Sequence, residues 1–207
     1  MSRRELPYFN IGKSYGGNQN WFLDFWMHIG GCGALTMCDL MIYMALRRDR
    51  SECVPFDAHN LTRREYVRFG MQMKPYLRPR NTGIKDLETF IDGAEHYLQE
   101  NGIKGIRMTG FSGHRTYEEA EQILIQQIDR GMPVPMIMLN HREKSFSFFE
   151  WHWFLINGYE YRAQSDTEIC YVKAATYGKA HWLRFDSFWD TGEEEKGGLI
   201  LVSDGFI

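Results

Sequence analysis

The chain has 207 residues, the length of one domain, with room for two lobes around a shared core. Hydrophobic residues make up 43% and charged residues 25%, which excludes a disordered chain. Lys and Arg number 24 against 27 Asp and Glu, so the net charge is −3. We therefore expect no nucleic-acid partner and no acidic membrane held by bulk positive charge.

The chain carries no sign of a membrane span or a disulfide framework. No run of about 18 apolar residues predicts a transmembrane helix, and the start lacks the apolar core of a signal peptide. We expect a cytoplasmic protein, with a secretion signal removed by trimming as the alternative. The cysteines are expected to be free thiols, and no zinc-ligand spacing appears, so neither metal nor cofactor is expected. They are Cys32, Cys38, Cys53 and Cys170.

The first half of the chain predicts helices. Residues 34–46 are apolar nearly all round, which favours a central buried helix. A capping box, Thr116 to Glu119, opens another helix that stops at Gly131. Further helices are expected over residues 63–73 and 85–100.

The second half predicts strands. Short apolar runs separated by polar or glycine-containing links replace the helical period. Strands are expected over residues 103–108, 133–139, 152–161, 168–176, 181–185 and 198–202. Helices followed by strands favour an α+β fold with an antiparallel sheet. We expect one domain over 1–207, mainly helical over 1–131 and mainly β over 132–207, with a site in the cleft between these lobes.

Cys32 is the candidate nucleophile. It follows Gly30-Gly31 and enters the buried helix, where unpaired N–H groups and the helix dipole favour thiolate. We expect these groups to lower the pKa of the thiol and to hold an oxyanion. The alternative is a small buried residue at a tight helix entrance. The other three cysteines are weaker candidates, and Cys38 is expected in the core.

His152 is the candidate base. It opens an apolar strand whose bulky neighbours would exclude water, although a histidine bonded within the core is the alternative. Gln19 supplies an amide that can donate to the same oxyanion, unless it is an ordinary turn residue. Six other histidines are weaker candidates for the base: His28, His59, His96, His114, His141 and His181.

These motifs, in this order, resemble a papain-like cysteine peptidase of the C39-like branch, related to bacteriocin-leader peptidases. The matching residues are Gln19, the pair Cys32-Gly33, and the strand His152 to Tyr159. Further on, residues 175–178 resemble the segment that supplies the third catalytic residue, and residues 197–201 resemble the last strand. The resemblance implies a helical lobe packed on a twisted antiparallel sheet, with Cys32 as nucleophile, His152 as base and acid, and Gln19 as oxyanion donor.

Two departures from the family pattern matter. Gln19 and Cys32 are more widely spaced than in most members, so Asn18 or Asn20 is an alternative donor. The third position is normally Asn or Asp, whereas Thr176 stands here. Thr176 could orient the imidazole without a negative charge. Asp186 and Asp190 are alternatives from the next segment.

The leading functional interpretation is a thiol hydrolase that acts on an amide bond, most simply a peptidase with a peptide or small amide substrate. A Cys–His amidase or acyltransferase is the second enzyme interpretation. The alternative from another class is a non-catalytic papain-like domain that binds a peptide or protein partner. No transporter segment accompanies the domain, so leader processing is not implied, and nothing in the sequence predicts the oligomeric state.

Overall fold

The computed structural model describes residues 2–80, 83–164 and 167–205. In this part of the chain, seven strands form one antiparallel sheet in the order β4-β9-β5-β6-β7-β8, with β1 beside β6. The sheet strands are β1 (Arg3–Glu5), β4 (Arg107–Ser112), β5 (Val134–Met138), β6 (His152–Gln164), β7 (Thr167–Thr176), β8 (Lys179–Arg184) and β9 (Gly197–Ser203). A small hairpin joins β2 (Asn10–Ile11) to β3 (Ser14–Tyr15).

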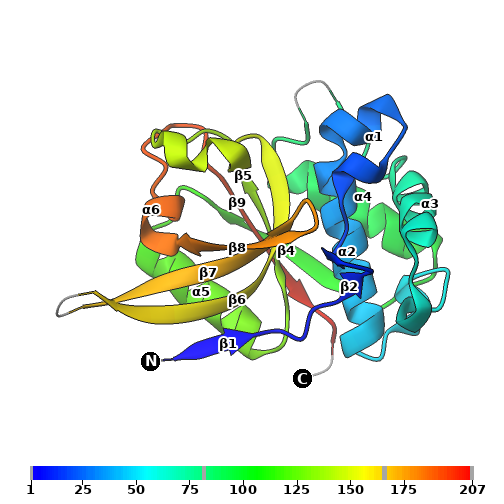
Figure 1. The fold of residues 1–207 in the computed structure, drawn as a ribbon, viewed down its shortest axis with the longest axis horizontal. Helices are drawn as coiled ribbons and strands as arrows, with labels where there is room; N and C mark the ends of the chain where they lie inside the picture. The colour runs from blue at the N-terminus through cyan, green and yellow to red at the C-terminus, as the bar shows by residue number, and fades with distance from the viewer. Residues whose placement is uncertain (1, 81–82, 165–166, 206–207) are drawn as a thin grey trace.

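The helices lie in two groups around this sheet (Figure 1). Helices α1 to α4 gather on the side where β4 and the start of β6 lie, whereas α5 and α6 pack against the other strands. The helices are α1 (Phe25–Gly30), α2 (Cys32–Arg47), α3 (Arg63–Met73), α4 (Leu87–Glu100), α5 (Tyr117–Asp129) and α6 (Phe185–Trp189). Short 3-10 helices are η1 (Gln19–Trp21), η2 (Ser51–Cys53), η3 (Ala58–Asn60) and η4 (Lys144–Phe149). The fold is therefore α+β with an antiparallel sheet, as the sequence predicts.

Helix α2 is the centre of the core. Every residue from Cys32 to Met44 is buried, because the sequence offers apolar side chains on all faces of the helix. The helix packs against β6 on one side and α3 on another. Trp153 of β6 also links the sheet to the helical part of the chain. Its indole N–H donates to the Ile84 carbonyl at 2.8 Å, and its ring stacks on Phe90 of α4. These contacts bring the first turn of α2 next to the first residues of β6.

The observed elements differ from the expected ones mainly where the chain is short or irregular. The strand expected over 103–108 is β4 at 107–112, because Ile103 and Ile106 enter the core from a loop and pairing with β9 begins only at Arg107. Strands β1 and β4 join the sheet from residues 1–131, the part of the chain expected to be mainly helical. Helices α1 and α6 and strands β1 to β3 have no counterpart among the expected elements.

The burial of α2 predicts where the fold is sensitive to truncation. Met41 is fully buried in α2, whereas Met71 of α3 is 38% exposed. Met41→Ala should lower the free energy of unfolding by about 2–5 kcal/mol through lost burial and a residual cavity. Met71→Ala is the matched control and should change it by about 0.5 kcal/mol or less. Urea denaturation of both variants measures the difference, and equal effects would contradict a core centred on α2.

Candidate active site

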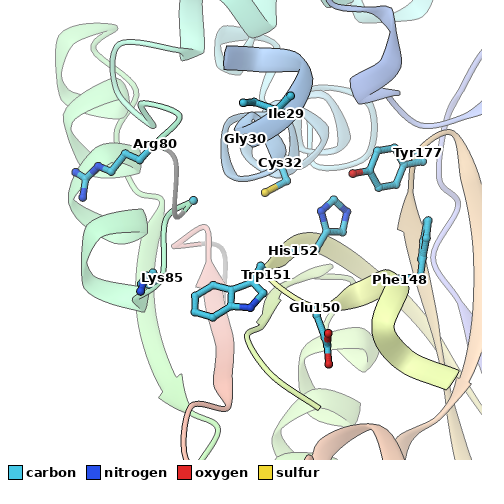
Figure 2. Close-up of a pocket in the computed structure, with 11 residues that line it drawn as sticks. Ile29, Gly30, Cys32, Arg80, Lys85, Phe148, Glu150, Trp151, His152 and Tyr177 are labelled. Atoms are coloured by element: carbon cyan, nitrogen blue, oxygen red, sulfur yellow. The ribbon is translucent and has the colours of Figure 1, made fainter. Parts of the chain in front are cut away.

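The thiol of Cys32 lies where two helices meet end to end. A Cβ at Gly31 would lie 2.4 Å from the Met27 carbonyl oxygen, so only glycine lets α1 pass directly into α2. Cys32 is then the first residue of α2, and the residue is 6% exposed. It lines a cavity of about 590 Å³ (Figure 2). The tight entrance that the two glycines predict is present.

His152 enters the same cavity from the sheet. It is the first residue of β6, paired with Met138 of β5, and Figure 2 shows its ring beside the Cys32 side chain. The imidazole Nε2 lies 2.7 Å from Thr176 Oγ1, at the end of β7. That hydrogen bond holds the ring in one orientation and engages Nε2, so Nδ1 is the ring nitrogen without a hydrogen bond among the described residues. The structure thus brings Cys32, His152 and Thr176 together.

Tyr177 also lines the cavity, although the sequence predicts no role for it. Together with Gly178 it forms the two-residue turn between β7 and β8, and both residues have positive φ, at 48° and 73°, as a type I′ turn requires. The Tyr177 ring stacks on the His152 imidazole at a centroid distance of 4.8 Å and an interplanar angle of 11°. Its hydroxyl points toward Cys32 in Figure 2. A Tyr-Gly pair at a hairpin turn is the sequence signal that could have found it.

Gln19 also reaches the site. It is 4% exposed and lines a narrow crevice together with Cys32 and His152. Its Nε2 donates to the His28 carbonyl at 2.8 Å, which leaves the second amide proton free for another acceptor.

The two asparagines beside Gln19 are placed differently. Asn18 donates to the Tyr177 carbonyl at 3.0 Å and accepts from the Asn20 backbone N–H, and Asn20 itself is exposed. Both Asn18 side-chain groups are therefore engaged with the backbone. Of the three amide side chains considered from the sequence, Gln19 is the one in the crevice with Cys32.

Burial sets the resting charge of the pair. Burial raises the pKa of the Cys32 thiol, although the backbone N–H groups of Trp153, Gly33 and Cys32 act in the opposite direction. The expectation of a lowered thiol pKa is therefore wrong, because the loss of hydration outweighs the helix start. Burial also lowers the pKa of His152 to about 4. At neutral pH the pair is a thiol beside a neutral imidazole, and no hydrogen bond joins them within the described residues.

The alternative site residues are engaged elsewhere. Burial raises the pKa of both Cys53 and Cys170 to about 12, and Cys38 is fully buried inside α2. Asp186 accepts two hydrogen bonds from Arg184, and Asp190 Oδ1 lies 3.7 Å from the Nζ of Lys196. Neither carboxylate bonds to the His152 ring, whose Nε2 is engaged by Thr176.

The cavity has apolar rims. Among the described residues, seven large apolar side chains are exposed, and three of them line the cavity: Ile29, Phe148 and Trp151. Phe25 and Trp26 are exposed on α1, which also carries Ile29. The side chain of Lys85 lies at the edge, with its ammonium 4.8 Å from the centre of the Trp151 ring. The lining therefore combines exposed apolar side chains with the charged side chains of Arg80, Lys85 and Glu150.

Three comparisons with known proteins give no match: no protein-family model, no curated protein and no solved structure is similar to this chain. Within the described ranges, no helix is long and apolar enough to cross a membrane. The same residues contain no group of three or more His, Cys, Asp or Glu side chains that could hold a metal ion.

The neutral resting pair has a measurable consequence. The folded pKa of His152 lies below the ordinary value of 6.5, so its contribution to stability is present above pH 6.5 and is lost as pH falls toward 4. The shift corresponds to about 3 kcal/mol. Urea denaturation between pH 7 and pH 4 should therefore show an acid-induced loss that His152→Gln lacks. An NMR titration that finds the His152 ring protonated at pH 7 would contradict the assignment.

Proposed function

We propose that the protein is a thiol hydrolase that cleaves an amide bond through Cys32 and His152. The observation that carries the proposal is the hydrogen bond between His152 Nε2 and Thr176 Oγ1, which orients a histidine that lines the same cavity as a helix-start cysteine. His152 also lines this cavity together with Cys32, as a base for the thiol must. The resemblance to papain-like peptidases in the order and spacing of the motifs supports the same roles.

The neutral pair supports general-base catalysis. As the substrate carbonyl enters, the Cys32 thiol proton moves to His152 Nδ1 while the sulfur bonds to the carbonyl carbon. The carbonyl π electrons move to its oxygen, and the resulting oxyanion accepts from the Cys32 backbone N–H and the free amide proton of Gln19. Nε2–H donates to Thr176 throughout and fixes the base.

The second half of the reaction returns the enzyme to its starting state. The tetrahedral intermediate collapses, the C–N bond breaks, and the leaving amine takes the proton from His152. Water then attacks the thioester carbonyl and gives one proton to His152. The C–S bond breaks, the acid leaves, and the proton on His152 returns to the sulfur to re-form the thiol. An amine acceptor in place of water would give acyl transfer, so the same residues serve the amidase or acyltransferase alternative.

The cavity favours substrates with large apolar groups. Its two rims carry Ile29 on one side and Phe148 and Trp151 on the other, and all three are exposed in the free protein. A substrate that covers them removes apolar area from water, which favours binding. We propose a peptide, or a small amide, with a bulky apolar side chain close to the cleaved bond.

A non-catalytic binding domain is the second candidate. The observation that favours it is the hydroxyl at Thr176, because a hydroxyl cannot stabilise an imidazolium as a carboxylate would. Together with the raised thiol pKa, this arrangement gives a less reactive site than a charged triad. In this reading the apolar rims bind a peptide without cleaving it.

Replacement of the nucleophile separates the two candidates. Cys32→Ser should abolish Cys-dependent turnover of p-nitrophenyl acetate and of a peptide library, because the hydroxyl has a far higher pKa than the thiol. It should still bind apolar peptides, since the rims are unchanged. Cys53→Ala is the matched control at a buried thiol outside the cavity and should keep the wild-type rate. Absence of turnover in the wild type, with equal peptide binding in both forms, would establish the binding domain instead.

Replacement of the orienting hydroxyl tests the third position. Thr176→Val keeps the shape but removes the acceptor for His152 Nε2, and we expect kcat to fall about tenfold to a hundredfold. Thr176→Asn supplies an amide oxygen and should retain more activity than the valine variant. Thermal unfolding curves check that both variants are folded. An unchanged kcat for Thr176→Val would show that another group orients the ring.

A further inference from the structure

Asp39 is a buried carboxylate that the proposed chemistry does not use. It lies about two turns after Cys32 along α2 and is 7% exposed, inside a helix whose neighbouring positions are mainly apolar. A carboxylate in such a place is costly unless hydrogen bonds compensate for the lost water. The contacts of Asp39 therefore point to a function.

Three donors converge on this carboxylate. Tyr8 donates its hydroxyl to Oδ2 and Tyr66 donates its hydroxyl to Oδ1, each at 2.7 Å. The backbone N–H of Gly17 lies 3.2 Å from Oδ2 and 3.3 Å from Oδ1, so it is shared between the two oxygens. Of the two tyrosines, Tyr8 lies in the segment between β1 and β2 and Tyr66 lies in α3, and both are buried. The third belongs to a loop that leads directly to Gln19.

The loop backbone packs directly on the cluster. A Cβ at Gly17 would lie 1.7 Å from the Tyr66 hydroxyl, and a Cβ at Gly16 would lie 2.7 Å from Asp39 Oδ2. Only glycine allows this approach, and at Gly16 the positive φ of 71° adds the same requirement. The position of the loop is therefore set by the carboxylate and its two tyrosines.

The same loop holds two parts of the site. Two residues after Gly17, Gln19 reaches the crevice beside Cys32. Between them, Asn18 donates to the Tyr177 carbonyl in the hairpin turn that follows Thr176. One buried carboxylate thus connects the helix of the nucleophile to the oxyanion donor and to the turn beside the histidine.

We propose that Asp39 is a positioning residue: by holding the N–H of Gly17, it places Gln19 to donate to the oxyanion. This inference rests on the proposed hydrolase function. Asp39 lines the same crevice as Cys32 and Gln19 but hydrogen-bonds to neither of them, and it acts through the loop. Burial raises its pKa to about 6, while the hydrogen bonds from the donors Tyr66, Tyr8 and Gly17 oppose that rise.

Asp39→Asn is the test variant. It keeps the volume but replaces one shared acceptor oxygen with an N–H₂ donor, which faces donors already aimed at the carboxylate. Two rates are then compared. Alkylation of Cys32 by iodoacetamide forms no oxyanion and reports the thiol and His152 alone. Turnover of p-nitrophenyl acetate passes through an oxyanion and also needs Gln19.

A positioning role predicts a split between these rates. In Asp39→Asn, kcat for the ester should fall about tenfold to a hundredfold, while the alkylation rate changes less than about threefold. Asp204→Asn is the matched control, because Asp204 is another buried carboxylate, paired with Arg48 away from the cavity. It should lower the melting temperature without changing the ratio of the two rates.

The double variant shows whether Asp39 acts through Gln19. If it does, Asp39→Asn combined with Gln19→Ala should lose no more ester turnover than Gln19→Ala alone. Additive losses, or equal falls in alkylation and turnover, would overturn the proposal and leave a purely structural role.

Amide hydrogen exchange tests the same inference without any turnover. Exchange at residues 17–19 should rise at least tenfold in Asp39→Asn, whereas exchange in the central turns of α2 should stay within about threefold of the wild type. Unchanged exchange at 17–19 would overturn the positioning role. A wild type that exchanges as expected but turns over no ester would instead count against the hydrolase function.

Discussion

The arrangement of the site depends on the burial of α2. Since the first three turns of this helix are enclosed by the sheet, α3 and the N-terminal segment, its first residue has little freedom to move. Cys32 is therefore held in a fixed position next to the start of β6, whose first residue is His152. The same enclosure removes water from the thiol and raises its pKa. Positioning and reactivity therefore come from one physical cause, and they act in opposite directions.

The polar groups of the site form a chain of neutral contacts. Thr176 holds His152 by a hydroxyl, Tyr177 covers the imidazole with a ring, and Gln19 approaches through an amide. Of the two carboxylates that line the cavity or the crevice in the described residues, Asp39 accepts from tyrosines and backbone and Glu150 accepts from the His141 backbone N–H, so neither bonds to the imidazole. In a buried cavity, neutral partners avoid the desolvation of an unpaired charge. Such a site is suited to chemistry in which charge develops only when the substrate is bound.

Sequence patterns predict the parts of this structure that depend on local periodicity. The span of α3 and the strands β5 to β9 follow from apolar spacing, and the helix-start cysteine follows from the glycines before it. Short elements such as α1 are not predicted, because six residues are too few to show a helical period. The roles proposed for Tyr177 and Asp39 could not be predicted from the sequence for another reason. Each depends on contacts between segments far apart in the chain, which no local pattern contains.

At the turn of Tyr177, the residue that would be best for stability differs from the one that covers His152. A tyrosine with a φ of 48° occupies a conformation that asparagine or glycine adopts at lower energy, and such a residue typically stores about 1–3 kcal/mol of strain. Selection for thermal stability alone would therefore favour replacing Tyr177 with a smaller turn residue. That replacement would uncover the face of the His152 ring that the tyrosine now covers. Variants of this chain optimised only for heat resistance would thus admit water to the imidazole while their fold improved.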